Sequence, residues 1–318
     1  MAGVLRRAVL GGLAAGASLG AGAGAARARV PRPADLEGVW TLGTYTDLER
    51  PPALHALVLT PAEAEAYEAP RRRLGGMPVP NADDVLGQAE TERSERGDGL
   101  ARVRGQIRSS WIVDPPDGRI PFTAEGLAAV ARARTEQFAN PEGLSGTTRC
   151  LANAAAGAPM SGGPDANLFQ LVQTPDAVVI VSEKYHEVRI IRMGAAARGP
   201  VQPPQWTGDG VGHWEGASLV AETRGGHPGA ILRGGRLMAV ETSRVTERFT
   251  RTARDELIYE FTVEDPVLYA RAWRGEMALR PAPGRMFEFA CHEGNYSLPG
   301  ILAGARLEER EAAAKGGK

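Results

Sequence analysis

The run AVETSRVTERFTRTARDELIYEFTVEDPVLYARAWRGEMAL, residues 239–279, decides the fold of this chain. It predicts three successive strands, at 239–252, 256–264 and 270–279, because segments rich in β-branched and aromatic residues alternate with short polar stretches. The pair Arg254-Asp255 is typical of a tight turn between the first two segments. Consecutive strands joined by short turns indicate an antiparallel meander.

Strands are expected over most of the remaining chain as well. The segments are 38–42, 107–113, 167–173, 177–182, 187–193, 213–223 and 286–291. About ten strands in one run favour a closed barrel or a strongly curved sheet over two separate domains. The sequence therefore predicts a mainly β fold, an antiparallel meander that forms a lipocalin-like or otherwise curved barrel. The triplet Gly38-Val39-Trp40 also resembles the opening strand of lipocalin-type barrels.

Two short helical insertions interrupt these strands. Helices are predicted at 61–73, where Pro61 stands at the first helical position, and at 123–138. Both fall in an insertion at 61–140 within a single domain that spans 29–307, and 308–318 is expected to be a polar tail. A long loop is expected at 143–165, and long ordered loops in compact domains tend to be functional.

The N-terminus has the pattern of an export signal. Arg6-Arg7 precede a run of small apolar residues, and Ala26-Arg27-Ala28 fits a small-x-small cleavage site. The run lacks the bulky residues of a membrane span. A signal peptide at 1–28 is therefore predicted, with a mature protein that is periplasmic or secreted and has no membrane span. The paired arginines leave twin-arginine export and general secretion open.

The chain has two cysteines, Cys150 and Cys291. In an oxidising compartment they could form one disulfide, which would hold the loop at Arg149 beside the C-terminal cluster described below. The alternative is two unpaired cysteines. A catalytic thiol fits an exported protein less well, because such compartments disfavour free thiols.

The charge balance argues against two classes of partner. The chain has 37 basic and 38 acidic residues and a formal net charge of -1. Such a balance creates no overall field that would attract nucleic acid or an anionic lipid surface. A small-molecule ligand or substrate is the expected partner, and no nucleic acid is expected.

Four motifs resemble those of a known family. They are Gly212-His213-Trp214-Glu215-Gly216, Tyr259-Glu260-Phe261-Thr262-Val263-Glu264-Asp265-Pro266, Ala290-Cys291-His292-Glu293-Gly294-Asn295-Tyr296 and, upstream, Asp114-Pro115-Pro116-Asp117-Gly118-Arg119-Ile120-Pro121. Together they resemble a family of exported bacterial proteins for which no activity is established. Members of that family often continue the His-Trp-Glu-Gly motif with Asp-Thr, whereas this chain has Ala217-Ser218. The resemblance implies export and says nothing about chemistry.

Side-chain alternation places several polar residues at the end of a predicted apolar face. If 213–223 is one strand, His213 and Glu215 head its apolar face. His186 shares a face with Val188 and Ile190 in the same way. These residues are therefore predicted to lie at the mouth of a cavity.

The end of the last predicted strand is less regular. His292 and Glu293 follow each other there, so at most one of them points inward if the strand continues. Asn295 and Tyr296 then add an amide and a phenol to the cluster.

Three hypotheses for this set remain open. The first is a cofactor-free acid/base enzyme, a lyase, isomerase, hydratase or cyclase acting on a partly apolar organic substrate. Its predicted catalytic residues are His213, Glu215, His292, Glu293, His186 and Tyr296, and its predicted substrate-binding residues are Arg189, Asn295, Trp214 and Arg149. The two arginines would hold a substrate carboxylate, or else pair with Glu187 and a surface acid.

The second hypothesis is a metal-dependent enzyme, and the third is a non-catalytic carrier. Imidazole and carboxylate suit zinc or iron, but the chain has no compact HxH or HExxH spacing, so no metal site and no cofactor is predicted. In a lipocalin-like carrier the same residues would be ordinary rim and core groups.

Overall fold

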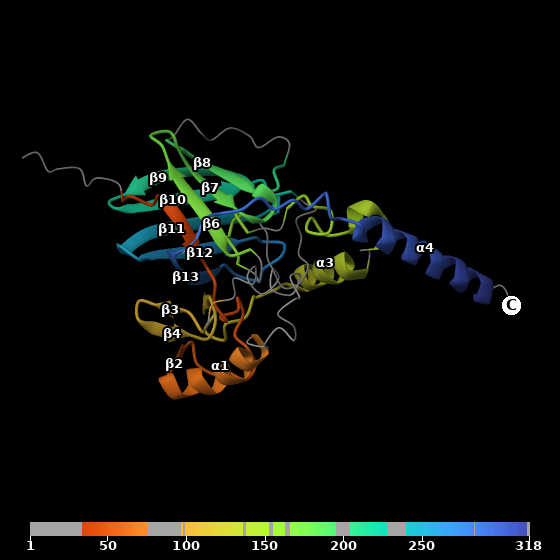
Figure 1. Cartoon of the computed structure of the whole chain (residues 1–318), viewed down its shortest axis with the longest axis horizontal. Coiled ribbons are helices and arrows are strands. Elements are labelled where there is room, and N and C mark those ends of the chain that lie inside the picture. Colours follow the sequence, from red (N-terminus) through yellow and green to blue (C-terminus); the bar gives the residue numbers. More distant parts are fainter. Residues whose placement is uncertain are drawn as a thin grey trace, which may run out of the picture. The chain divides into compact units, whose positions relative to one another are not determined.

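The computed structural model describes residues 34–75, 97, 99–135, 138–152, 155–162, 166–194, 204–227, 240–282 and 284–316. The predicted signal peptide at 1–28 lies outside this part of the chain. The described residues are largely strands with a few helices, and the strands form a closed barrel (Figure 1). The prediction of a mainly β barrel fold is confirmed.

The barrel closes because β1 pairs with β6 on one side and with β13 on the other. A tenth strand, β5 (Ile112–Asp114), adds to β13 beyond the closure. The strands of the barrel, in sheet order, are β1 (Gly38–Thr41), β6 (Leu168–Gln173), β7 (Ala177–Ser182), β8 (Val188–Met193), β9 (Asp209–Glu215), β10 (Ser218–Arg224), β11 (Arg244–Ala253), β12 (Glu256–Glu264) and β13 (Trp273–Pro281).

Strand β12 illustrates how alternation builds the barrel. Its bounds are those predicted, and Leu257, Tyr259, Phe261 and Val263 are at most 2% exposed. Phe261 lies over Gly275 of β13, where a Cβ atom would come within 2.1 Å of the ring. Burying a large apolar side chain contributes about 1.5–3 kcal/mol, so this inward row is a main source of stability.

The topology departs from a simple meander in two places. Strands β8 and β9 pair in parallel, with Ile191 opposite Gly210, while the other described barrel pairs are antiparallel. Strand β1 comes first in the chain but closes the barrel between β6 and β13. A parallel pair cannot be joined by a tight hairpin.

The predicted strand 213–223 is wrong, because the chain reverses within it. Gly216 has φ +62, which suits glycine, and it lies in the turn between β9 and β10. Trp214 pairs with Leu219 across this hairpin, and both side chains pack toward the core. Two turn residues shift the phase of alternation, so every side chain before the turn lies on the face opposite to the predicted one.

The interior of the barrel is filled by its own loop. Ala155, Ala156, Ala158 and Met160, from the predicted long loop, are all at most 4% exposed and belong to the main core. The same core contains an aromatic group in which the centroids of neighbouring rings lie 4.8–6.0 Å apart: Phe249, Tyr259, Phe261, Tyr269 and Trp273. The lumen is therefore a packed core.

A buried polar network ties this loop to the strands. The Arg189 guanidinium donates to both carboxylate oxygens of Glu247, to Thr223 Oγ1 at 2.6 Å and to the Gly157 carbonyl at 3.2 Å. The Tyr259 hydroxyl donates to Glu247 Oε1 at 2.6 Å and accepts the Met160 N–H at 2.8 Å. Every charge in the network thus has hydrogen-bonded partners, as burial requires.

The titration of this network follows from its burial. Although burial opposes the charge of Arg189, the Glu247 carboxylate holds the pKa of the guanidinium above its ordinary value. Burial first, and then the same carboxylate, raises the pKa of the Tyr259 phenol well above its ordinary value of 10.0. Arg189 therefore stays charged while Tyr259 stays neutral.

The insertion at 61–140 contributes both helices and strands. Helix α1 (Pro61–Gly75) begins with a capping box, in which Thr60 and Glu63 exchange side chain to backbone hydrogen bonds. Helix α3 (Ala124–Thr135) follows the turn at 114–118, so both predicted helices are confirmed. The predicted strand 107–113 is wrong: β4 (Gln106–Arg108) joins a small sheet with β2 (Val58–Leu59) and β3 (Arg102–Val103), whereas β5 joins the barrel sheet.

The C-terminal tail is longer and more regular than predicted. Helix α4 (Ser297–Gly316) begins eleven residues before 308, and the Arg306 guanidinium donates to the Phe138 and Ala139 carbonyls. The described part of the chain also has the short helices η2 (Pro141–Gly143) and η3 (Lys184–His186). Among the helices in the described part of the chain, none is long and apolar enough to cross a membrane.

Candidate functional site

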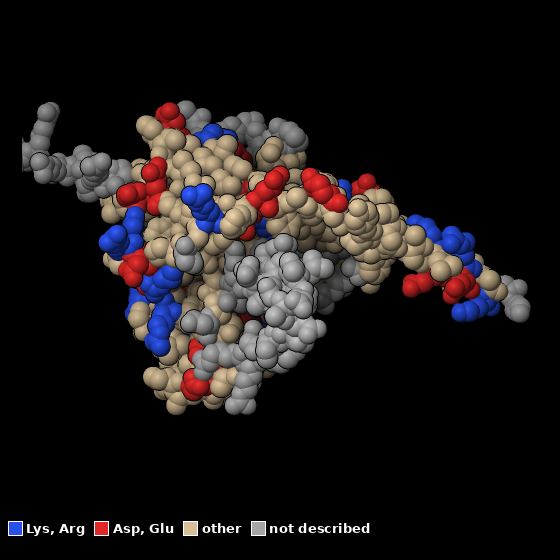
Figure 2. Space-filling model, in the orientation of Figure 1, with Lys and Arg blue, Asp and Glu red and all other residues tan. Residues whose placement is uncertain are grey.

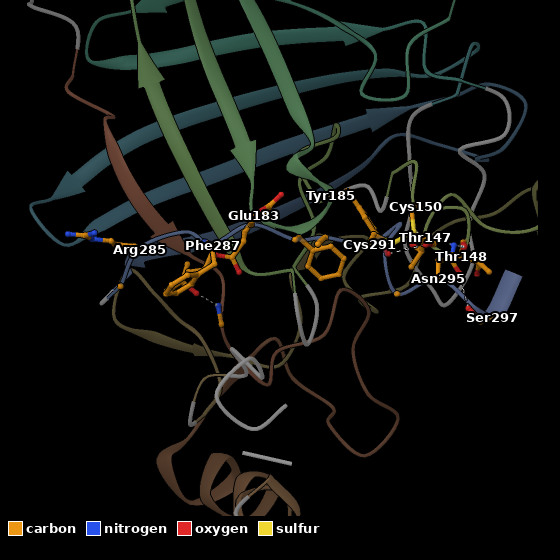
Figure 3. A pocket seen from close by; sticks show the side chains of 18 of the residues that line it. Thr147, Thr148, Cys150, Glu183, Tyr185, Arg285, Phe287, Cys291, Asn295 and Ser297 are labelled. Atoms are coloured by element: carbon orange, nitrogen blue, oxygen red, sulfur yellow. Dashed lines mark hydrogen bonds between the residues drawn. A yellow bond between two sulfur atoms is a disulfide. The ribbon is translucent and has the colours of Figure 1, made fainter. Parts of the chain in front are cut away.

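A pocket of about 1260 Å³ lies at the rim of the barrel (Figure 3). One wall is the C-terminal segment 284–296, which we call the strap. The other walls come from the ends of β1 and β6, from the connection between β7 and β8, and from the loop at 147–150. Aromatic side chains and polar groups share the lining: Thr41, Thr147, Thr148, Glu183, Tyr185, Arg285, Phe287, Glu288, Phe289, Asn295 and Ser297.

The strap is not the strand predicted at 286–291. The edge of β13 that such a strand would need is already taken, because β1 pairs there and the Ala282 N–H donates to the Val39 carbonyl. The strap instead crosses the barrel rim as irregular chain. The Phe287 N–H donates to Glu183 Oε2 at 2.6 Å, and the Phe289 N–H donates to His186 Nε2 at 3.3 Å.

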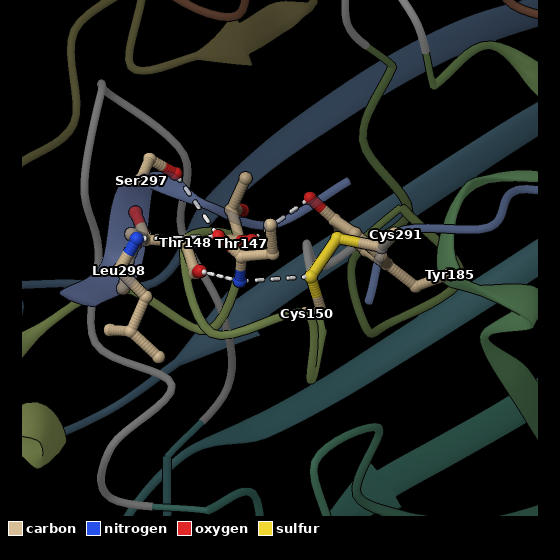
Figure 4. The surroundings of a disulfide bond; sticks show 9 residues. Thr147, Thr148, Cys150, Tyr185, Cys291, Ser297 and Leu298 are labelled. Carbon is tan, nitrogen blue, oxygen red and sulfur yellow. Dashed lines mark hydrogen bonds between the residues drawn. A yellow bond between two sulfur atoms is a disulfide. The ribbon is translucent and has the colours of Figure 1, made fainter. Parts of the chain in front are cut away.

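The disulfide between Cys150 and Cys291 fixes the middle of the strap. It joins two segments 141 residues apart, with Cα atoms at 5.8 Å, and both cysteines line the pocket (Figure 4). The Asn295 amide donates to the Thr148 carbonyl at 2.9 Å and approaches Cys150 Sγ at 3.3 Å. The predicted disulfide is confirmed, and it holds the loop beside the cluster as expected.

An aromatic pair lines the central part of the pocket. Tyr185 and Phe289 meet edge to face with ring centroids at 5.0 Å, and Lys184 Nζ lies 5.5 Å from each ring. The Tyr185 hydroxyl donates to the Thr147 carbonyl at 3.0 Å, so the ring bridges barrel and loop. Phe287 is 74% exposed next to this pair. An apolar surface of this kind is available to a ligand.

His213 and Glu215 do not lie at a cavity mouth. Because of the turn at Gly216, both point away from the core, and their side chains are 60% and 48% exposed. His213 Nε2 and Glu215 Oε1 are 3.1 Å apart, and Arg248 forms an ion pair with Glu215. The Arg248 guanidinium first, and His213 second, hold the pKa of Glu215 below its usual value. The pair is hydrogen-bonded, as an acid/base pair requires, but it lies on the outer wall.

The prediction for the face of β8 is also inverted. His186, Val188 and Ile190 are exposed, while Glu187 and Arg189 point inward. Arg189 therefore belongs to the lumen network and does not line the pocket. Its carboxylate partner is Glu247, not Glu187 as one reading of the sequence suggested.

The remaining predicted residues are divided between the rim and the core. His292, Glu293 and Tyr296 lie in the strap and are exposed, Tyr296 to 82%, but they are not among the residues that line the pocket. Arg149 adjoins the disulfide and Trp214 packs against the core. Of the predicted catalytic and substrate-binding residues, only Asn295 is in the lining. His186 contacts the lining residue Phe289, whose N–H donates to His186 Nε2. Their catalytic roles stay predictions.

The outer wall of the barrel has intermixed charges. Blue and red side chains alternate at the left of Figure 2. Among the barrel strands, Arg280 of β13 forms an ion pair with Glu256 of β12. Within the described part of the chain, no group of three or more His, Cys, Asp or Glu side chains is arranged to hold a metal ion.

Comparison with known proteins adds no relative. No family model matches the chain, and no curated protein or solved structure is detectably similar to it. The motif resemblance to exported bacterial proteins stays a prediction, and function is argued from the pocket.

Sequence reasoning missed Glu183 and Tyr185, which contribute the barrel side of the pocket. Tyr185 has φ 62 and His186 φ 49, left-handed values that are uncommon outside glycine, asparagine and aspartate. The available signal was an aromatic residue in the short connection between two strands, the first ending at Ser182 and the second beginning at Val188. It indicates a ring that the turn presents at the barrel rim.

Proposed function

We propose that the protein is an exported binding protein that holds a small, partly apolar molecule in the pocket under the strap. The observation that carries the proposal is the pocket itself, about 1260 Å³ in volume and lined by three aromatic rings with polar groups around them. Ligand sites are typically concave, mostly apolar and supplied with a few oriented polar groups. The disulfide beside the rings fits a compartment in which such bonds persist.

Binding is favoured over catalysis by the placement of the titratable groups. The lumen, where a barrel carrier commonly holds its ligand, is filled by Ala155 to Met160 and the Arg189 network. The predicted acid/base pair of His213 and Glu215 is exposed on the outer wall. General acid/base chemistry needs the reacting groups within hydrogen-bond reach of a bound substrate, and the pocket at the rim is where a ligand would be held.

A thermal-shift screen of the purified, oxidised protein tests this proposal. The library should contain small aromatic and aliphatic compounds that are neutral, acidic and basic. We expect at least one class to raise the Tm, because a ligand that binds only the folded state stabilises it. Phe287→Ala should weaken that ligand about tenfold, the effect of losing about 1.4 kcal/mol of apolar contact.

A matched control tests whether the loss of ligand affinity is specific to the pocket. Ile190 is also an exposed apolar side chain, 53% accessible, but it lies on the outer wall of β8. Ile190→Ala should leave the ligand affinity unchanged. If Phe287→Ala and Ile190→Ala weaken the ligand affinity equally, the ligand does not bind in the pocket. A complete absence of ligands would count against a binding function.

A further inference from the structure

Within the described part of the chain, one main-chain edge of the strap is hydrogen-bonded and the other is not. Residues 285–290 cross the rim outside any helix, strand or turn. The N–H groups of Phe287 and Phe289, two residues apart, both donate to side chains of the β7 to β8 connection. In extended chain, the N–H and C=O of the residue between them point to the opposite edge.

By this alternation, the main-chain groups of Met286, Glu288 and Ala290 belong to the opposite edge. Among the described residues, no hydrogen bond engages the main-chain N–H or C=O of Met286, Glu288 or Ala290. Glu288 and Ala290 both line the pocket. A row of open main-chain donors and acceptors is what an edge strand presents to an added strand.

The pocket follows the strap along its length. In Figure 3 the labelled side chains Arg285, Phe287, Cys291, Asn295 and Ser297 succeed one another across the view. The wall facing them includes Gly43 and Gly97, which present main chain without side chains. An elongated space with main chain on two sides suits an extended ligand better than a compact one.

Side chains next to the open edge would set the preference of the site. Phe287 and the pair of Tyr185 with Phe289 offer apolar contact, and Arg285 and Glu288 add charges of both signs. Main-chain hydrogen bonds supply affinity and alternate side chains supply specificity when a peptide adds to a sheet edge. Resting on the proposed function, we infer that the ligand class is an extended peptide segment with an apolar residue, bound along the strap edge that carries Glu288.

Fluorescence anisotropy with labelled pentapeptides on the full-length, oxidised protein tests the inference. The peptides are acetylated and amidated, so that terminal charges play no part, and carry apolar residues at alternate positions. The best binder is then N-methylated at each residue in turn. We expect losses of about fivefold or more at alternate positions, where methylation removes an N–H that faces the strap, and little change between them.

Two variants of the protein test the same main-chain edge by changing the strap instead of the peptide. Glu288→Pro removes the open N–H and should weaken the peptide about fivefold, whereas Glu288→Ala keeps that N–H and should bind within about twofold of the wild type. The disulfide content and the Tm of each variant confirm that it is folded. If Glu288→Pro does not fold, the N-methylation pattern on the wild-type protein decides alone.

The outcomes separate this inference from the proposed function. If apolar small molecules bind and depend on Phe287 while no peptide binds, the peptide inference is wrong and the proposed function stands. Peptide binding without an alternating N-methylation pattern also contradicts the inference, because main-chain pairing requires alternation. If neither class binds, both proposals are wrong.

Discussion

The barrel lumen and the pocket under the strap use polar side chains in opposite ways. In the lumen, Arg189 and Glu247 have no exposure, and hydrogen bonds from the strands and the loop engage every polar atom of Arg189 except Nε. In the pocket, Glu183 and Asn295 hold the strap through the Phe287 N–H and the Thr148 carbonyl, Glu288 is exposed, and a single disulfide fixes the wall opposite the barrel. Charges inside the barrel therefore hold the fold together, whereas the exposed side chain of Glu288 at the rim is available to a ligand.

The largest expected effect comes from breaking the lumen pair. Glu247→Ala leaves the Arg189 guanidinium buried without its carboxylate, which costs about 3–5 kcal/mol. Urea unfolding of the purified protein measures this loss. Arg192→Ala is the matched control. It removes an ion pair with Asp209 in which the Arg192 side chain is 45% exposed, so the expected loss is below about 1 kcal/mol. Similar losses in both variants would contradict a buried, coupled pair.

The disulfide is expected to have the next largest effect. Cys150 and Cys291 close a loop over a separation of 141 residues, and removal of a native disulfide costs about 2–5 kcal/mol. The variant with Cys150→Ser and Cys291→Ser should also lose pocket binding, because the strap is released at its centre. Near-ultraviolet circular dichroism of the buried aromatic group should stay unchanged. A double variant that binds ligand as the wild type does would show that other contacts hold the strap.

A smaller effect depends on pH. Burial raises the pKa of both Tyr259 and Tyr269, whereas phenols of the unfolded chain ionise near pH 10. Above about pH 10 the folded state therefore binds more protons than the unfolded state, and stability falls as the pH rises. The contribution is fully present below that pH. Urea unfolding at about pH 8 and about pH 11 measures the difference.

Tyr259→Phe isolates the part of this dependence that comes from the lumen. The variant should lose about 1–3 kcal/mol near pH 8, because the Met160 N–H and the Glu247 carboxylate each lose a partner. It should also lose less stability than the wild type between the two pH values. Tyr296→Phe is the control, since that phenol is 82% exposed and should change neither quantity. An identical pH dependence in Tyr259→Phe and wild type would contradict the assignment.

Much of the barrel could be predicted from local patterns, and the lumen network could not. Strand β12 and the hairpin of β6 with β7 follow from alternation and turn residues. The partner of Arg189 is 58 residues away in sequence, and the barrel brings the two together only when it closes. An inward arginine on a strand with apolar residues at 188 and 190 also inverts the usual pattern, which is why the wrong face was expected to be buried.

The site was harder to predict for two physical reasons. The turn at Gly216 is only two residues long, and missing it moved His213 and Glu215 from the outer wall to the inner face. The strap resembles a strand in composition, but β1 already pairs with the edge that it would need. The disulfide could be predicted because it depends on the cysteine count and on the export expected from the N-terminal pattern.

The smallest expected effect comes from the outer wall, at His213. Its side chain is 60% exposed and meets Glu215 across 3.1 Å, while Arg248 remains as a second partner of that carboxylate. Because the Arg248 hydrogen bond is the main reason that the pKa of Glu215 is low, Glu215 should stay ionised in His213→Ala. The urea midpoint and the affinity of any pocket ligand should therefore be unchanged, in contrast to Phe287→Ala. If His213→Ala leaves binding intact but abolishes the conversion of a bound substrate, the acid/base hypothesis holds, and the chemical step involves the outer wall as well as the rim.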